Sequence, residues 1–136
     1  MNNTLKKYLV ASFLVLSLGT ANPVTAATET QAAMTQATNA AIANLEAALK
    51  AVTENKLDAA QDYIDATRDS ASDILGACSI EAKKQHGSTA LKNARRQIRN
   101  GDTAGATVSL KEAIEIFKSL LLSVNTERQS VFKWFK

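Results

Sequence analysis

The 136-residue sequence has little of several residue types, and each shortage excludes a class of structure. Its single cysteine, Cys78, cannot form a disulfide within the chain, so a disulfide-stabilised fold is excluded. Its single proline, Pro23, precedes all of the periodic sequence, and only five glycines are present, so few residues interrupt a helix. Its single histidine, His86, falls far short of a zinc site, which needs three or four nitrogen or sulfur ligands.

Motifs of enzyme active sites are lacking too. The sequence has no glycine-rich phosphate loop, no CxxC, CxxCH or HExxH motif, and no nucleophile–base pair with a family signature. The carboxylates fall on faces expected to be solvated, where the raised pKa of a catalytic acid is not favoured. We therefore expect a protein that is not an enzyme and has no cofactor. A divalent cation is the one ion that we consider as a candidate ligand.

Residues 1–26 have the pattern of a secretory signal peptide. Lys6 and Lys7 form a positive segment, residues 8–18 are apolar, and small residues precede Ala27. The apolar run is shorter than a typical membrane span, which disfavours the alternative of an uncleaved anchor helix. We expect cleavage between Ala26 and Ala27 and a periplasmic or secreted location.

The charge gives no indication of a nucleic-acid partner. The formal net charge is +3, but two of the 16 basic residues are Lys6 and Lys7, so the predicted mature chain carries only +1. No basic stripe is interleaved with aromatic residues, which make up 5% of the chain. The mature chain also contains no second apolar run long enough to span a bilayer.

The mature sequence is a helical hairpin written twice, with a shift of 46 positions. The helix-spaced apolar positions of residues 41–75 coincide with those of residues 87–121. Leu45 matches Leu91, and the turn residue Asn55 matches Gly101. We expect buried stripes at Met34, Thr38, Ala41, Leu45, Ala48 and Val52; at Leu57, Ala60, Ile64, Thr67, Ala71 and Ile74; at Ile80, Gly87, Leu91, Ala94 and Ile98; and at Ala106, Leu110, Ala113, Phe117, Leu120 and Val124.

The short connections predict an all-α, up-down-up-down four-helix bundle over residues 27–125. Two stacked hairpins of a solenoid are the alternative, although two units are fewer than such arrays need. The expected start signals are Thr28 with Gln31, Asn55, Ser79, and Asp102 or Thr103, and Gly76 is expected as the residue that ends the second helix. Gly87 either allows close backbone approach or breaks the third helix.

Residues 126–136 form an amphipathic aromatic tail, which the Thr126–Gln129 spacing predicts to be a separate short helix. The tail either folds back over the extra apolar surface of the fourth helix or provides a docking surface for a partner helix, a second copy or a membrane interface. The expected interaction residues are Cys78, Leu121, Leu122, Phe132, Trp134 and Phe135. Cys78 is either a small buried hydrophobic residue or an intermolecular disulfide partner.

Charged side chains of opposite sign follow the second and third helices. The acidic row on one face of the second helix consists of Asp58, Asp62, Asp65, Asp69 and Asp73. It either is simply solvated or holds a divalent cation loosely, with His86 as a further candidate ligand. The basic row lies late in the third helix and is expected to face part of the acidic row: Lys92, Arg95, Arg96 and Arg99. Met34 and His86 lie early in the first and third helices, which start at the same end of the predicted bundle. A methionine and a histidine placed in this way could ligate a haem iron.

The segment from His86 and Gly87 through Ala90, Leu91, Ala94, Ile98, Gly101 and Ala106 to Ala113 and Ile114 resembles the small metal-binding proteins. Those are exported four-helix bundles built from a duplicated hairpin, and similar spacings occur in the periplasmic YfdX family. The resemblance covers roughly residues 33–122 and implies this fold and compartment. The family has a histidine-rich surface, whereas this sequence has only His86 at such a place.

The sequence therefore predicts an exported bundle that acts by binding. The first hypothesis is a protein-interaction or stress-associated accessory module with a protein partner or a second copy, and with peripheral membrane contact through the tail as a further option. The alternative is a low-affinity protein for divalent metals that uses the acidic row.

Overall fold

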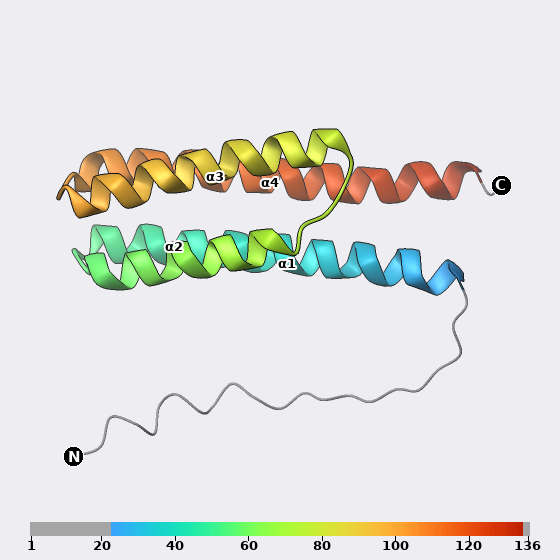
Figure 1. The fold of residues 1–136 in the computed structure, drawn as a ribbon, viewed down its shortest axis with the longest axis horizontal. Coiled ribbons are helices and arrows are strands. Elements are labelled where there is room, and N and C mark those ends of the chain that lie inside the picture. The colour runs from blue at the N-terminus through green and yellow to red at the C-terminus, as the bar shows by residue number, and fades with distance from the viewer. Residues whose placement is uncertain (1–22, 135–136) are drawn as a thin grey trace, which may run out of the picture.

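The computed structural model describes the backbone of residues 23–134 and the side chains of residues 30–126. The described chain forms four helices in an up-down-up-down bundle, as predicted (Figure 1). The helices are α1 (Pro23–Thr53), α2 (Leu57–Ser72), α3 (Cys78–Arg99) and α4 (Thr103–Trp134). None of them is both long and apolar enough to cross a membrane.

The core consists of the stripes that the sequence spacing predicts. Every residue of the four predicted stripes is buried except Leu57, which is partly buried and packs against the core. The two polar members, Thr38 and Thr67, are fully buried, and each hydroxyl donates to the carbonyl four residues earlier, at 2.7 and 2.8 Å. These bonds satisfy the hydroxyls locally, so the two threonines occupy apolar positions without an unpaired polar group.

The two tight turns have the same backbone geometry. After α1, the Lys56 N–H donates to the Ala51 carbonyl at 2.8 Å and the Asn55 N–H donates to the Val52 carbonyl at 3.0 Å. After α3, the bonds from Asp102 and Gly101 repeat this pattern 46 positions later, at 2.9 and 3.0 Å. This pair of bonds is the Schellman motif, which ends a helix with a residue of positive φ.

The turn residues have partly different roles from those expected. Asn55 is the left-handed residue that ends α1, so its prediction as the cap of α2 is wrong; the cap position is Lys56, which makes no side-chain cap bond. Asp102 does cap α4, because its carboxylate accepts the Gly105 N–H at 2.8 Å.

The connection between the hairpins begins earlier than expected. The helix α2 ends at Ser72, four residues before Gly76, and Gly76 does not have the positive φ of a helix-ending glycine. The helix α3 already begins at Cys78, with Ala77 at its cap position, so Ser79 is not the cap. Ile74 lies in the connection and is fully buried, so the chain remains anchored to the core while it crosses between hairpins.

The outer helices are longer than the capping-box signals predict. The helix α1 begins at Pro23, so Thr28 lies inside it, while residues 1–22 of the predicted signal peptide lie outside the described residues. The helix α4 continues to Trp134 without a break, and the Thr126 hydroxyl donates to the Leu122 carbonyl at 2.8 Å, as inside a helix. The expectation of a separate helix after Asn125 is therefore wrong, because no glycine or proline there ends α4.

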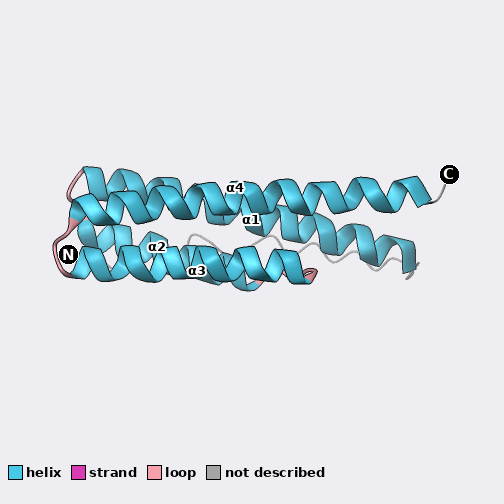
Figure 2. Ribbon diagram, turned by 90° about the horizontal axis from the view of Figure 1, so that it is seen from above, coloured by secondary structure: helices cyan, strands magenta, loops and turns pink. Residues whose placement is uncertain are grey.

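The bundle has two different ends (Figures 1 and 2). Both tight turns lie at one end, whereas α1 and α4 extend beyond α2 and α3 at the other. Near the base of this extension, the Gln31 side-chain amide donates to the Val124 carbonyl at 2.7 Å and links the two long helices. We call this extension the two-helix arm: it consists of the first part of α1, from Pro23, and the last part of α4, up to Trp134.

Gly87 permits close approach of α3 to α4. The helix α3 runs through Gly87 without a break, and a Cβ atom at this position would lie 2.7 Å from Cε2 of the buried Phe117 ring. This confirms the first of the two expectations for Gly87. The Phe117 ring fills the space that the missing side chain leaves.

The two interfaces between the hairpins are unequal. The helices α1 and α4 pack along much of their length, whereas α2 and α3 contact each other at few places. Figure 1 shows α2 and α3 as the front helices of the two hairpins. The bundle is therefore closed by apolar packing between α1 and α4 and is open between α2 and α3.

Candidate functional site

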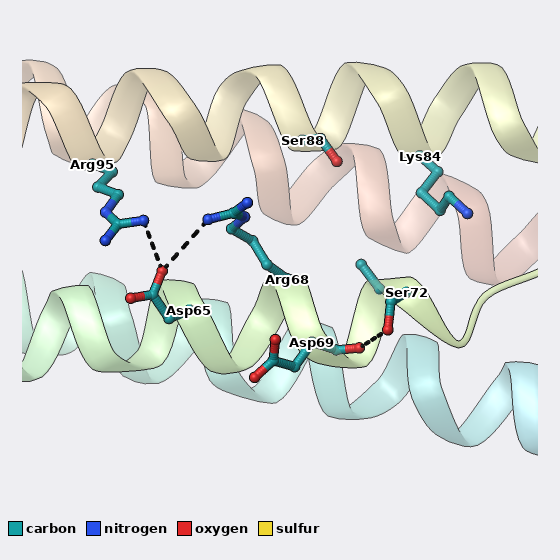
Figure 3. Close-up of a pocket in the computed structure, with 8 residues that line it drawn as sticks. Asp65, Arg68, Asp69, Ser72, Lys84, Ser88 and Arg95 are labelled. Atoms are coloured by element: carbon teal, nitrogen blue, oxygen red, sulfur yellow. Dashed lines mark hydrogen bonds and ion pairs between the residues drawn. The ribbon is translucent and has the colours of Figure 1, made fainter.

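A cleft of about 610 Å³ lies between α2 and α3. Most of its lining is polar or charged, and it comes from both helices (Figure 3): Asp65, Arg68, Asp69, Ala71 and Ser72 from α2, and Lys84, Ser88 and Arg95 from α3. Its volume lies within the range of small-molecule pockets. The cleft exists because the two helices that form its walls are held apart along most of their length.

An ion-pair cluster occupies one part of the cleft. Oδ1 of Asp65 lies 3.0 Å from NH1 of Arg95 across the cleft and 3.8 Å from NH1 of Arg68 on its own helix. The Arg95 side chain is 34% exposed, and its buried Nε has no hydrogen-bond partner among the described residues. The prediction that the basic row faces the acidic row is confirmed for this one pair. Pairs at such exposure contribute roughly up to 1 kcal/mol each.

Lys84 holds the other part of the cleft. Its ammonium group donates to the Ile74 carbonyl and to Glu81, both at 2.9 Å. The first of these bonds fixes the connection between the hairpins to α3, while Ser88 lies between Lys84 and Arg95 along the same helix (Figure 3). The Ser88 hydroxyl makes no hydrogen bond to another described residue, unlike that of Thr89 beside it, which donates to the Gln85 carbonyl.

The predicted acidic row does not come together as one site. Asp58 and Asp62 are exposed on α2 and Asp73 lies just beyond its end, whereas Asp65 and Asp69 line the cleft. Of the row, Asp65 is the described residue that pairs with a side chain of α3. Among the described residues, no three His, Cys, Asp or Glu side chains lie close enough to hold a metal ion. Divalent cation binding by the row stays a prediction.

His86 and Met34 lie in different environments. His86 is exposed and lines a shallow hollow of about 270 Å³ between α3 and α4, together with Glu112 and four other residues. Met34 is buried in the core and does not line this hollow. The structure therefore does not bring these two residues together as haem ligands.

Three of the predicted interaction residues lie near the base of the arm. Cys78 is exposed at the start of α3, so its expectation as a buried hydrophobic residue is wrong. Leu122 is 69% exposed on α4, Leu121 is half-buried, and Leu122 and Ser79 line a hollow of about 340 Å³ between the two helices. Phe132, Trp134 and Phe135 lie outside the residues whose side chains are described.

Sequence reasoning missed Arg68, Lys84 and Ser88 as lining residues of the cleft. Periodicity indicates which residues are buried, but it does not say which pair of helices is held apart. A signal was present in the duplication: Arg68, Ser88 and Arg95 stand 46 positions from Ile114, Ile42 and Leu49. A charged or polar residue in one copy where the other has an apolar residue marks an interface that differs between the copies.

Comparison of the chain with protein-family models, with curated proteins and with solved structures gives no match in any of the three. The resemblance to the small metal-binding proteins and to the YfdX family stays a prediction.

Proposed function

We propose that the chain is an exported, non-catalytic bundle that acts by binding another protein chain at its two-helix arm. The observation that carries this proposal is the unequal length of the helices: α1 and α4 continue where α2 and α3 have ended, with α1 of the exported chain beginning at Ala27. In the body of the bundle, α2 and α3 cover the apolar stripes of α1 and α4. In the arm no other described helix lies beside α1 and α4, and the apolar sequence spacing of a helix is stabilised by burial against another element.

The apolar sequence spacing of α4 continues into the arm. The seven-residue spacing that joins the buried residues Leu110, Phe117 and Val124 reaches Val131 next. The spacing that joins Ala113 and Leu120 passes through the charged Glu127 before it reaches Trp134. Leu122, at the base of the arm, adds an exposed apolar side chain. Together these residues favour a helical partner that lies against the arm.

A second copy of the same chain is the partner that fits this arm best. Two arms packed side by side make four helices and continue the bundle from one molecule into the next. In such a dimer each copy supplies the same surface, which is the commonest form of association in soluble proteins. Export would place Cys78 in an oxidising compartment, where a disulfide between copies is stable.

Site-specific photocrosslinking tests the proposal with a matched control on the same helix. Leu122 and Val108 are similarly exposed, at 69% and 67%, but Val108 lies at the end of α4 opposite the arm. A photoreactive phenylalanine derivative at position 122 is expected to give a covalent dimer, and the same group at position 108 is expected to give none. Equal crosslinking from both positions, or none from either, would contradict binding at the arm.

Sedimentation equilibrium provides the second measurement. Leu122→Glu is expected to weaken association of the purified protein, while Val108→Glu leaves it unchanged. A crosslink from position 122 to a different protein, with no dimer, would retain the binding function and reject the second copy as partner. Export is tested separately by the mass of the protein from the secreted or periplasmic fraction, which is expected to begin at Ala27.

A second candidate function is weak binding of divalent cations by the exposed carboxylates of α2. Calorimetric titration with calcium, zinc and copper tests it, and clear stoichiometric binding would place it above protein binding.

A further inference from the structure

The duplication allows the open interface of the bundle to be compared with its closed counterpart. A shift of 46 positions relates α1 to α3 and α2 to α4, so the α1–α4 and α2–α3 interfaces are equivalent positions of the repeat. If both copies packed alike, the two interfaces would be alike. Instead one is packed and the other holds the cleft.

Three of the residues that line the cleft are polar where the equivalent residue of the other interface is apolar. In the closed interface Ile114 is buried at 6% exposure, and Ile42 and Leu49 are partly buried against the core. Their counterparts in the open interface are Arg68, Ser88 and Arg95, all of which line the cleft. Apolar residues pack together in the α1–α4 interface. The polar residues at the equivalent positions of α2 and α3 keep that interface open, at the expense of apolar burial.

The cleft also has hydrogen-bond donors that its own residues leave unused. Among the described residues, Arg95 Nε is buried without a hydrogen-bond partner, and the Ser88 hydroxyl makes no hydrogen bond. Within residues 30–126, whose side chains are described, Arg68 pairs only with Asp65, at 3.8 Å. The lining holds three cationic side chains against two carboxylates, with Glu81 beside Lys84 as a further negative group. Buried donors without acceptors are uncommon in folded proteins.

From these observations we propose that the α2–α3 cleft binds a small molecule through an oxyanion, either a carboxylate or a phosphate group. Arg68, Ser88 and Lys84 supply donors from opposite walls, and Asp65 orients the guanidinium groups of Arg68 and Arg95. Guanidinium groups suit this role because their planar donors match carboxylate and phosphate oxygens. The volume of about 610 Å³ fits a small organic acid or phosphate ester.

Titrations followed by nitrogen–proton NMR test the site directly, because the Nε–H of arginine gives its own signal. The purified protein is titrated with sodium phosphate and, separately, with succinate, at constant ionic strength maintained with sodium chloride. Saturable shifts of the Arg95 Nε–H and the Ser88 amide are expected, with a dissociation constant of about 1 mM or lower. Saturation by phosphate alone or by succinate alone identifies the oxyanion, and either result supports the site.

Three variants separate a site from general charge attraction. Ser88→Ile introduces the residue of the equivalent position 42, and Arg68→Gln removes one cation; each is expected to weaken binding at least about tenfold, the loss of one charged hydrogen bond. Lys92→Gln removes the same charge from an exposed position of α3 outside the cleft and is expected to leave binding unchanged. Shifts that stay linear with concentration, or equal weakening in Lys92→Gln and Arg68→Gln, would overturn the proposal. Far-UV circular dichroism of each variant checks that the fold is retained.

Discussion

Asn55 and Gly101 occupy the same position in the two hairpins, and both have a positive φ, 57° for Asn55 and 75° for Gly101. A side chain makes this conformation unfavourable, by roughly 1–2 kcal/mol for most residues and less for asparagine. Asn55→Gly is therefore expected to raise the free energy of unfolding by about 0.5 kcal/mol, because glycine adopts the turn without this cost. Urea denaturation followed by circular dichroism measures it, and a loss of stability would show that the Asn55 side chain stabilises the turn.

The opposite change at Gly101 is expected to destabilise the protein. A Cβ atom there would meet nothing within 4 Å, so the cost of Gly101→Ala arises from the backbone alone and not from a clash. We expect a loss of about 1–2 kcal/mol in the free energy of unfolding. An unchanged denaturation midpoint would show that the turn after α3 relaxes to another conformation.

Gly87→Ala is expected to destabilise the bundle through the Phe117 ring. The new Cβ would lie 2.7 Å from Cε2 of a side chain that is fully buried and has little space to move. Overpacking of this kind costs about 1–3 kcal/mol, against about 1 kcal/mol gained because alanine favours the helix, so a net loss of about 0–2 kcal/mol is expected.

The double variant with Phe117→Leu provides the control for Gly87→Ala. The combined loss is expected to be smaller than the sum of the two single losses, because the smaller side chain makes room for the methyl group. Additive losses in the same denaturation assay would mean that Gly87 acts through helix α3 alone.

The turn between α1 and α2 carries an ion pair whose pH dependence can be derived. The hydrogen bond and charge of Lys56, 2.7 Å from Glu54, lower the pKa of the Glu54 carboxyl, and Glu54 raises the pKa of Lys56 in turn. Because the pKa of Glu54 is lowered in the folded protein, its carboxylate adds to the free energy of unfolding above the ordinary glutamate pKa. This stabilisation is lost as pH falls through the folded pKa of Glu54. Because the pKa of Lys56 is raised in the folded protein, its ammonium group also adds to the free energy of unfolding, and this stabilisation is lost as pH rises through the folded pKa of Lys56. Both groups are exposed, so the effect on stability is small.

Lys56→Gln is expected to return the pKa of Glu54 toward its ordinary value. Carbon NMR of the Glu54 carboxyl across an acid titration measures this change directly. Lys50→Gln is the matched control, because Lys50 lies 4.0 Å from the same carboxyl and contributes less to its pKa. A larger shift in Lys50→Gln would contradict the assignment to Lys56.

Cys78 is expected to crosslink two molecules under mild oxidation. The thiol is exposed at the start of α3, near the base of the arm that we propose as the dimer contact. Non-reducing gel electrophoresis of the oxidised protein is expected to show a dimer that Cys78→Ser abolishes. If Leu122→Glu removes this dimer as well, the crosslink depends on the arm, whereas an unaffected dimer would reflect random collision of exposed thiols.

The sequence was sufficient to predict the fold and nearly all of the core, because both depend on the spacing of apolar residues along a helix. Thr38 and Thr67 illustrate this: each is polar, yet its position in the stripe correctly indicated burial. Helix ends were predicted less well. The Thr126–Gln129 spacing and Gly76 are local signals, and they were overridden where α4 continued and where α2 ended early.

The cleft could not be predicted from one copy of the hairpin. The facing of Arg95 and Asp65 followed from the helix order, but the open seam depends on how two hairpins dock. The separation of α2 from α3 is set by tertiary packing between residues far apart in the chain, such as those of α1 and α4. Only the residue-by-residue comparison of the two copies, Arg68 against Ile114, contains this information.

The placement of both tight turns at one end of the bundle has a consequence for how the chain folds. The most extensive helix contacts lie within each hairpin and so join residues close in sequence, which favours rapid formation. Each hairpin is expected to form as a unit, and the two units then dock along α1 and α4. Amide hydrogen exchange should accordingly be slowest in the body of the bundle, where four helices pack together, and faster in the two-helix arm. The molecule is then expected to open first at the arm.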